Sequence, residues 1–452
     1  HYPLRRQRQM CIRDRPIIDL IILFMIFAFL LYYFKPSLLL LNTHIAGGDT
    51  ISHFVLADYL KNYLLPHGKL IGWYPHWFAG VPMFQFYFVL PYLMAAVLSY
   101  AIPLEIAFKL ITILGTFLMP IAAFFSLKMI GFKFPVPAVA AVLTLAFLFL
   151  ESNSYYGGNI PSTLAGESSY SFSFALMILL LGSLYKGVET KKLLVFNSVL
   201  LALVVLTHIY TAIVITATAM FFLLLKKRKD NFFYLFKVFF IGFLLSSFWA
   251  LPFVFKLNYS SAPKELVGKP NPSLIYLQNF NPFYLLAAVA VFIGLRNRDR
   301  RILYFCFSAI TALILFAILS QYVHLLYIRF LPFLYFFPLL LSAFAIGEIV
   351  KMKKIRFDFL IPIVVFVAVA IWLSKTTTFI PFWIQWNYEG IESKATWNSF
   401  NKVLNAMAAL NESGRIIVEY SASYDKFGSP RVFELSPVFT NRSVMESLLL
   451  ES

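Results

Sequence analysis

The chain has 452 residues, of which 60% are hydrophobic and only 13% are charged. A mean hydropathy of +0.77 exceeds what a water-soluble domain carries, so the composition predicts a polytopic membrane protein. The formal net charge of +17 comes from short basic clusters between apolar runs, a distribution typical of cytoplasmic loops and not of nucleic-acid binding. Cys11 and Cys306 are isolated, which indicates neither a disulfide framework nor a metal site.

The first fifteen residues, HYPLRRQRQMCIRDR, are strongly basic and differ from everything that follows. The run RQRQMCIRDR resembles translated sequencing-adapter sequence, and the alternative is a genuine basic cytoplasmic tail. We exclude 1–15 from reasoning about the fold. The chain starts without Met and stops in mid-pattern at LLLES, so we expect a fragment of a longer protein.

Apolar runs between 16 and 374 predict a module of about 11 transmembrane helices, since about 20 apolar residues cross a ~30 Å hydrocarbon core. Several runs are close to the lower length limit. The predicted fold class is therefore an all-α polytopic membrane protein. In chain order the predicted spans are 17–34, 106–127, 135–151, 170–186, 192–206, 209–225, 233–252, 281–295, 302–320, 326–349 and 357–374.

Basic clusters predict the orientation, because Lys and Arg gather in cytoplasmic loops. The clusters are Lys128 with Lys133, Lys186 with Lys191 and Lys192, the KKRK at 226–229, the Arg-rich run 296–301 and the basic run 351–356. Placing all of them in the cytoplasm leaves outside the segments 35–105, 152–168, 207–208, 253–280, 321–325 and the tail from 375.

The apolar segment 84–103 conflicts with this arrangement, since only an odd number of crossings fits between 84 and 128. We predict that it lies at the membrane interface or re-enters from outside, because its first half is aromatic and Pro91 interrupts it. The alternative makes this segment a span and places Lys128 and Lys133 outside.

The residue pattern of the tail 375–452 differs from that of the apolar runs before it. WNSFNKVLNAMAALNES has a helical pattern, and GRIIVEYSAS alternates as a strand does. The tail therefore predicts the beginning of an external α/β domain.

The motif GGDTISH at 47–53 places a carboxylate at the start of a long, predicted external loop. Two Gly allow close backbone approach, and Asp49 is a candidate general base or metal ligand. The alternative is that Asp49 caps a helix beginning at Thr50. His53 lies four residues later on the same helical face, where it could share a proton or a metal with Asp49; the alternative is an interfacial His.

Other candidates lie in the predicted external segments or at the external end of a predicted span. Glu167, in a polar loop with Asn159, is a candidate second acidic ligand or an acceptor for sugar hydroxyls; the alternative is a helix N-terminal Glu. Arg329 stands in the apolar run YIRFLPF, where an unpaired charge costs about 3 kcal/mol. It is a candidate for binding a lipid phosphate, and the alternative is an interfacial Arg that reaches headgroups. Asn159, His208 and Trp73 are further candidates for substrate binding, although Trp73 also suits an aromatic membrane belt.

Several motifs together resemble a known group: GGDTISH, YLLPHGKLIGWYPHWFAGVP at 63–82, GESSYSF at 166–172, GRIIVEYS, and FGSPRVFELSPVFTNRSVMES near the end. They are similar to the prokaryotic membrane proteins termed "6-pyruvoyl-tetrahydropterin synthase-related", within the C-type (GT-C fold) membrane glycosyltransferase superfamily. The resemblance covers most of the chain from Ile17 onward. It implies an enzyme that moves a sugar from a polyprenyl-phosphate or polyprenyl-diphosphate donor on the external face.

The resemblance also implies an essential carboxylate in the first external loop and an acidic motif in the second, at places matched by Asp49 and Glu167. Neither loop contains a full Asp-x-Asp pair, which leaves open whether these two residues bind a divalent metal such as Mg or Mn. The expected partners are the polyprenyl-phosphate sugar donor, a glycan, lipid or protein acceptor, and membrane lipids. The expected location is the plasma membrane, with catalytic loops outside the cytoplasm.

Two other functions remain as alternatives. A transporter or flippase of lipid-linked glycans usually shows internal repeats and mid-span ionisable groups, whereas here the polar residues cluster in the predicted external loops. A non-catalytic envelope assembly protein is favoured if Asp49 only caps a helix. No Walker loop, dinucleotide fingerprint, Ser-His-Asp signature or HExxH is present, so an already activated, lipid-linked donor fits best.

Overall fold

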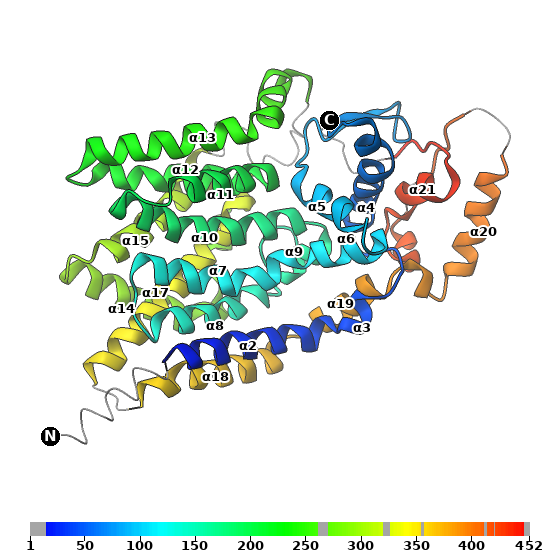
Figure 1. The fold of residues 1–452 in the computed structure, drawn as a ribbon. Coiled ribbons are helices and arrows are strands. Elements are labelled where there is room, and N and C mark those ends of the chain that lie inside the picture. Colours follow the sequence, from blue (N-terminus) through cyan, green and yellow to red (C-terminus); the bar gives the residue numbers. More distant parts are fainter. Residues whose placement is uncertain are drawn as a thin grey trace.

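The computed structural model describes residues 15–260, 270–319, 326–353, 357–410, 414–419 and 421–446. Long helices run side by side in a bundle, and short helices with a two-stranded sheet cover one end of it (Figure 1). The basic residues up to 14, which we excluded from reasoning about the fold, lie outside the described residues, as do the parts 261–269 and 321–325 of the predicted external loops.

Eight helical stretches of the described chain are long and apolar enough to cross a membrane. They contain α2 (Arg15–Phe34), α6 with α7 (Leu104–Thr112, Leu114–Ile130), α10 (Ser168–Thr190), α13 (Arg228–Phe255), α14 (Asn281–Arg296), α15 (Arg300–Ile314), α17 (Leu331–Met352) and α18 (Ile361–Thr376). Three apolar helices are shorter: α8 (Val136–Leu148), α11 (Leu194–Thr207) and α12 (Ile209–Ala219). Each predicted span coincides with one of these helical stretches, and the all-α polytopic fold class is confirmed.

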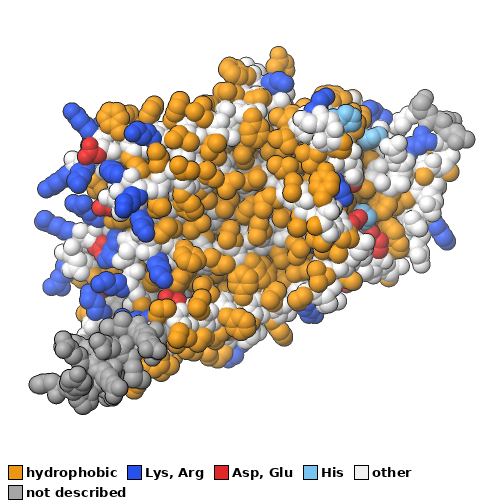
Figure 2. Space-filling view, viewed as in Figure 1, with side chains coloured by type: hydrophobic (Ala, Val, Ile, Leu, Met, Phe, Trp, Pro, Cys, Tyr) orange, Lys and Arg blue, Asp and Glu red, His pale blue; other side chains and the backbone are white. Residues whose placement is uncertain are grey.

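The bundle has an apolar flank and two different ends. Hydrophobic side chains cover the middle of the visible face, and Lys and Arg gather at the end where α10 stops and α13 starts (Figures 1 and 2). We call this the basic end. The opposite end, which we call the loop end, carries the His side chains seen in Figure 2 and the short helices. This separation agrees with a membrane crossed along the bundle axis.

The loop end is built from segments far apart in the sequence. The first of them contains α3 (Pro36–Leu39), α4 (Thr50–Tyr59), β1 (Gly72–Tyr74), β2 (Val81–Met83) and α5 (Leu90–Leu98), and β1 pairs antiparallel with β2 in the register Trp73 opposite Pro82. The second is α9 (Ile160–Ala165). The tail adds α19 (Ile380–Glu389), α20 (Trp397–Ala408) and α21 (Ser436–Thr440).

Two sequence interpretations can be compared with these elements. The segment 84–103 contains only the nine-residue helix α5, about 14 Å long at 1.5 Å per residue, which excludes a straight transmembrane helix. Its placement at the membrane interface stays a prediction. The helical pattern in the tail forms α20, whereas the strand-like run contributes one isolated bridge, from Ile416 to Val444, in the described part of the tail.

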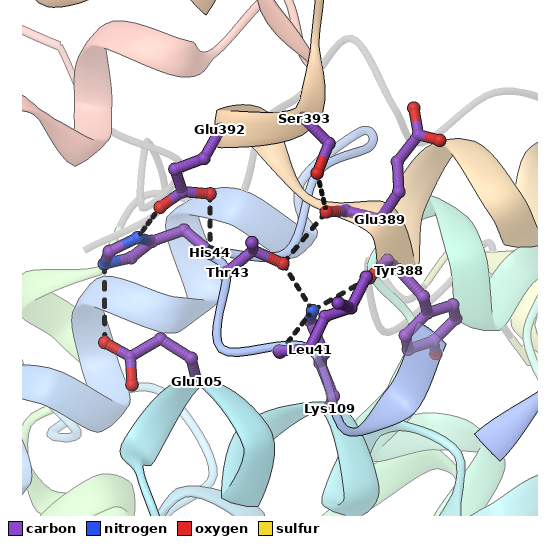
Figure 3. Close-up of polar contacts among 9 residues, drawn as sticks. All are labelled: Leu41, Thr43, His44, Glu105, Lys109, Tyr388, Glu389, Glu392 and Ser393. Carbon is purple, nitrogen blue, oxygen red and sulfur yellow. Dashed lines mark hydrogen bonds and ion pairs between the residues drawn. The ribbon is translucent and has the colours of Figure 1, made fainter. Parts of the chain in front are cut away.

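Lys109 joins the first segment of the loop end to the tail (Figure 3). Its Nζ donates to Thr43 Oγ1 at 2.7 Å, to the Tyr388 carbonyl at 2.8 Å and to the Leu41 carbonyl at 3.0 Å. The Lys109 side chain is fully buried. Because an ammonium has three donors and burial is costly unless they are satisfied, these three acceptors explain how a lysine is tolerated here.

We expect Lys109→Met to lower the free energy of unfolding by about 3 kcal/mol, because the substitution keeps the buried volume but leaves buried oxygens without donors. Thermal unfolding of the purified protein in detergent measures this. Lys69→Met, at an exposed position of the same loop-end segment, is the control and should change stability by less than about 0.5 kcal/mol. Equal stability of the two variants would contradict the assigned role of Lys109.

Sidedness can be tested with single cysteines in a background that lacks Cys11 and Cys306. Asn258→Cys lies in the exposed connection after α13, and Lys226→Cys lies at the basic end. A membrane-impermeant maleimide should label the first variant in intact cells and the second only after permeabilisation. Labelling of the Lys226→Cys variant in intact cells would overturn the topology.

Candidate functional site

Asp49 lies at the loop end, where the first segment packs on α9. Gly47 has φ +92° and Gly48 has φ +44°, a region that L side chains rarely adopt. A Cβ on Gly48 would lie 2.4 Å from the Ala165 carbonyl oxygen, and the Asp49 N–H donates to that oxygen at 2.9 Å. The glycines therefore permit the backbone of Asp49 to rest directly on the end of α9.

The tail forms hydrogen bonds to the same turn. The Gly47 N–H donates to the Gly428 carbonyl at 2.8 Å, and Ser429 Oγ donates to the Gly48 carbonyl at 2.7 Å. The indole of Trp77, which is fully buried, donates to the Glu434 carbonyl at 2.9 Å. These bonds position the turn Val432–Leu435 against α4.

The Asp49 carboxylate does not cap α4, although Asp49 occupies the N-cap position. Its Oδ1 instead lies 2.7 Å from Arg431 Nε. Arg431 Nη1 also donates to Glu434 Oε1 at 2.8 Å, and the Glu434 side chain is only 2% exposed. The Asp49 side chain remains 40% exposed, so it is held by an arginine and still open to a ligand.

Burial raises the pKa of the Asp49 carboxyl above its usual value of 3.8, and the charge and hydrogen bond of Arg431 oppose that rise. Burial also raises the pKa of Glu434, again against the effect of Arg431. One guanidinium thus keeps two carboxyls closer to their ionised forms. A carboxylate with a raised pKa is a stronger base, and such groups are frequent at functional sites.

Glu167 and Arg329 form an ion pair. Glu167 stands at the N-terminus of α10 without capping it, and Arg329 lies in the turn Tyr327–Phe330 that leads into α17. Arg329 Nη1 donates to the Tyr155 carbonyl at 2.7 Å, and the Tyr170 hydroxyl donates to the Arg329 carbonyl at 2.5 Å. The side chains are 15% exposed for Arg329 and 20% for Glu167, so pairing is what makes burial of both charges tolerable.

The segments that carry the two predicted carboxylates are in contact. Gly166 has φ +129°, and a Cβ there would lie 2.8 Å from the Asp49 Cβ, so the residue before Glu167 touches Asp49. The charge of Arg329 also acts on the Asp49 carboxyl, lowering its pKa. We call Asp49, Glu167, Arg329 and Arg431 the carboxylate–arginine cluster. It joins the first loop, the α9–α10 connection, the start of α17 and the tail.

His53 lies beside this cluster. Its backbone N–H donates to the Asp49 carbonyl at 3.1 Å. Its ring faces two tyrosines, with Nδ1 2.8 Å from the Tyr92 hydroxyl and Nε2 3.5 Å from the Tyr87 hydroxyl. Burial lowers the pKa of His53 to about 3, so the imidazole is neutral at physiological pH. The structure shows tyrosine contacts where the sequence predicted a proton shared with the Asp49 carboxylate. A catalytic role for His53 stays a prediction.

Asn159 is engaged within its own loop. Its amide nitrogen donates to the carbonyls of Leu150 and Asn153, each at 2.7 Å, and its Oδ1 accepts from the Ser162 N–H at 3.2 Å. The residue is 2% exposed. In this structure Asn159 shapes the loop before α9, and substrate binding by its side chain would require these bonds to break.

His208 and Trp73 occupy different surroundings. The His208 ring centroid is 4.8 Å from that of Tyr170. The Tyr170 hydroxyl donates to the Arg329 carbonyl, so Tyr170 links His208 to the cluster. Its Nδ1 has no hydrogen-bond partner within the described residues. Trp73 lies on β1 and is 60% exposed, which leaves its ring available for stacking.

The predicted Mg or Mn site stays a prediction. In the described parts of the chain, no group of three or more His, Cys, Asp or Glu side chains is arranged to hold a metal ion. Asp49 and Glu167 each pair with a guanidinium, so a divalent cation bound by both would share them with Arg431 and Arg329.

Sequence reasoning missed Arg431 and its partner Glu434. Both lie in the tail, which the sequence predicts to be the start of a separate domain. The available signal was the motif FGSPRVFELSPVFTNRSVMES, which contributed to the family resemblance without any role being assigned to its residues.

The bundle and the elements at its loop end define an all-α polytopic membrane protein. The family model described as "6-pyruvoyl-tetrahydropterin synthase related domain; membrane protein" matches residues 84–387. The chain therefore belongs to this family, as the sequence motifs predicted. Among curated proteins, no sequence matched the chain.

Solved structures of an archaeal enzyme have a similar fold. The apo crystal structure of the Archaeoglobus fulgidus oligosaccharyltransferase matches with a TM-score of 0.60 at 10% identity, over 96% of this chain. The same enzyme tethered by a disulfide to an acceptor peptide with the NVT sequon matches with a TM-score of 0.56 at 10% identity, also over 96% of this chain. The chain spans 65% and 64% of those two chains. Identity this low supports similarity of fold alone.

A double-mutant cycle tests the buried ion pair of the cluster. Glu167→Gln and Arg329→Gln should each lower stability by about 3 kcal/mol, because each leaves one largely buried charge without its partner. The double variant should lose less than the sum of the two single losses, since it removes both charges. Chemical unfolding in detergent measures all three variants. Strict additivity would show that the two side chains do not interact.

Proposed function

We propose that the protein is a membrane glycosyltransferase that transfers a sugar from a polyprenyl-phosphate-linked donor at the loop end, on the external face of the membrane. The observation that carries this proposal is the carboxylate–arginine cluster. It combines a partly exposed carboxylate of raised pKa with two guanidiniums, one of them at the start of an apolar helix.

The geometry suits displacement at a sugar carbon. Asp49 removes the proton from an acceptor hydroxyl or amide, and the acceptor atom forms a bond to the anomeric carbon. The bond from that carbon to the phosphate oxygen breaks, and polyprenyl phosphate leaves with the electron pair. Arg329 stabilises the negative charge that develops on the phosphate, because guanidinium binds phosphate oxygens in a bidentate manner.

Each arginine then has a distinct task. Arg431 keeps Asp49 oriented and ionised through the contact at 2.7 Å. Arg329 is held by Glu167 and by the Tyr155 carbonyl, which leaves it fixed before the donor arrives. A preorganised cation costs no rearrangement when charge develops, which is the main advantage of such a site.

The fold supports the same proposal. An apolar bundle holds the cluster at its end, where a lipid-linked donor can present its phosphate. The acceptor is a glycan, a lipid or a protein, and the location is the plasma membrane. The division into a membrane module, 16–374, and a tail domain, 375–452, is part of this proposal, with Arg431 as the contribution of the tail. The Asp49 side chain makes no capping hydrogen bond to α4, which favours an enzyme over a non-catalytic assembly protein.

Asp49→Asn should lower sugar transfer at least about 100-fold, since general base catalysis contributes about 10²–10⁴ in rate. The assay follows a labelled sugar from polyprenyl phosphate to acceptors in membranes that contain the protein. Asp58→Asn is the matched control, because Asp58 lies on the same helix and binds the Asn62 side chain. Wild-type transfer by a folded Asp49→Asn protein would refute the proposed role.

Arg431→Gln should move the acidic limb of the rate profile to higher pH. Arg431 lowers the Asp49 pKa, so its removal lets burial raise that pKa further, and a higher pH is then needed to ionise the base. The pH dependence of kcat/KM measures the shift. Arg415→Gln, at a guanidinium that donates to the Pro75 carbonyl, should leave the limb in place. A limb that stays fixed or moves to lower pH in Arg431→Gln would contradict the assignment of Asp49 as base.

A further inference from the structure

A cavity of about 660 Å³ opens at the basic end, away from the carboxylate–arginine cluster. It lies where α10 turns into α11, where α13 begins and where α15 starts, all at the same end of the bundle (Figure 1). Acidic residues contribute only Glu189 and Asp230 to its lining. The cations that line it are Lys191, Lys226, Lys227, Lys237 and Arg300.

The floor of the cavity is a connected polar network. Asn231 is 4% exposed; its amide nitrogen donates to the Phe222 carbonyl at 2.8 Å, and its Oδ1 accepts from Lys191 Nζ at 2.7 Å. Tyr234 is 6% exposed and donates to the Lys192 carbonyl at 2.6 Å. The base of the cavity is therefore fixed before any ligand binds.

The corner between α10 and α11 is held in an unusual conformation. Lys191 has φ +57° and Leu193 has φ +62°, values that are uncommon for residues other than Gly. This corner places Lys191 Nζ 5.6 Å from the centroid of the Tyr234 ring. Backbone strain persists only where the surroundings impose it, and it gathers at ligand sites.

The remaining cations of the cavity are available to a ligand. Lys226, Lys227, Lys237 and Arg300 are exposed, and within the described residues none of their side chains forms an ion pair. Several unpaired cations around one concave surface favour an anion with more than one acceptor oxygen. A phosphate group has this chemistry.

An apolar surface begins at the rim of the same cavity. Phe233, which is 60% exposed, lines it. Along α13, the rings of Phe232 and Phe236 lie 6.2 Å apart, and those of Phe236 and Phe240 lie 5.7 Å apart. All three are about half exposed, at 50%, 55% and 50%. A free phosphate has no apolar group to pack against these three rings, whereas the acyl chain of a lipid would pack along them.

We propose that this cavity binds the phosphate headgroup of an anionic phospholipid, whose acyl chains lie along the Phe row of α13. Basic pockets between transmembrane helices bind such headgroups, with electrostatic attraction to the lysines and apolar contact with the helix surface. The site is separate from the carboxylate–arginine cluster and does not depend on the function proposed for it.

Native mass spectrometry of the delipidated full chain tests the proposal, with dioleoyl-phosphatidylglycerol as the probe. Dioleoyl-phosphatidylcholine controls for the acyl chains, and inorganic pyrophosphate controls for phosphate alone. The triple variant Lys226→Gln, Lys227→Gln, Lys237→Gln removes cavity charge and keeps Lys191 in the floor. The matched control Lys133→Gln, Lys186→Gln, Lys229→Gln removes as many charges from exposed positions of the basic clusters outside the cavity.

We expect phosphatidylglycerol to bind at least about tenfold more tightly than phosphatidylcholine. The cavity variant should lose about tenfold in affinity for phosphatidylglycerol, since each lysine adds to the electrostatic attraction for an anionic lipid. The control variant should bind as the wild type does, and both variants should unfold at the wild-type temperature without lipid. Equal losses of affinity in both variants would show that diffuse surface charge, and not the cavity, attracts the lipid, and would overturn the proposal. Tight pyrophosphate binding without a preference for phosphatidylglycerol would overturn it in favour of a free-phosphate site.

Discussion

The close packing of the turn Gly47–Asp49 between α9 and the tail is the constraint on which the site depends. A side chain at Gly48 would collide with the Ala165 carbonyl, and one at Gly166 would collide with Asp49. Because both positions are glycine, three segments meet with their backbones in contact. This contact brings the backbone of Asp49 next to the residue before Glu167, and the Arg431 side chain reaches the Asp49 carboxylate from the tail.

Charge pairing is the second constraint. The loop end holds acidic and basic side chains where burial disfavours isolated charges, and the structure pairs them: Asp49 with Arg431, and Glu167 with Arg329. Lys109 satisfies its three donors with oxygens from two segments (Figure 3). These contacts hold the tail against the first loop, so the tail is part of the site. The basic end differs, because there the cations around the cavity outnumber the acids and remain open to an anionic ligand.

The sequence was sufficient for the membrane helices, because a long apolar run has few other structures available to it. It also indicated Asp49, Glu167 and Arg329 as candidate site residues, since charged residues in apolar or Gly-rich surroundings are conspicuous; their roles stay predictions. It could not identify Arg431 as the partner of Asp49, because pairing across most of the chain leaves no local pattern. It also could not show that His53 faces Tyr92 and Tyr87, since helical periodicity gives the face of a helix but not the neighbours of that face.

In the proposed function, Asp49, Glu167, Arg329 and Arg431 form one site that receives a lipid-linked sugar. A cryo-electron microscopy structure of the full chain with a non-transferable polyprenyl-phosphate sugar analogue tests it most directly. We expect the donor phosphorus within about 4 Å of the Arg329 guanidinium, as charge-assisted hydrogen bonds require, with the sugar beside Asp49. A donor phosphate bound elsewhere on the bundle, with the four side chains out of contact with it, would refute a shared site.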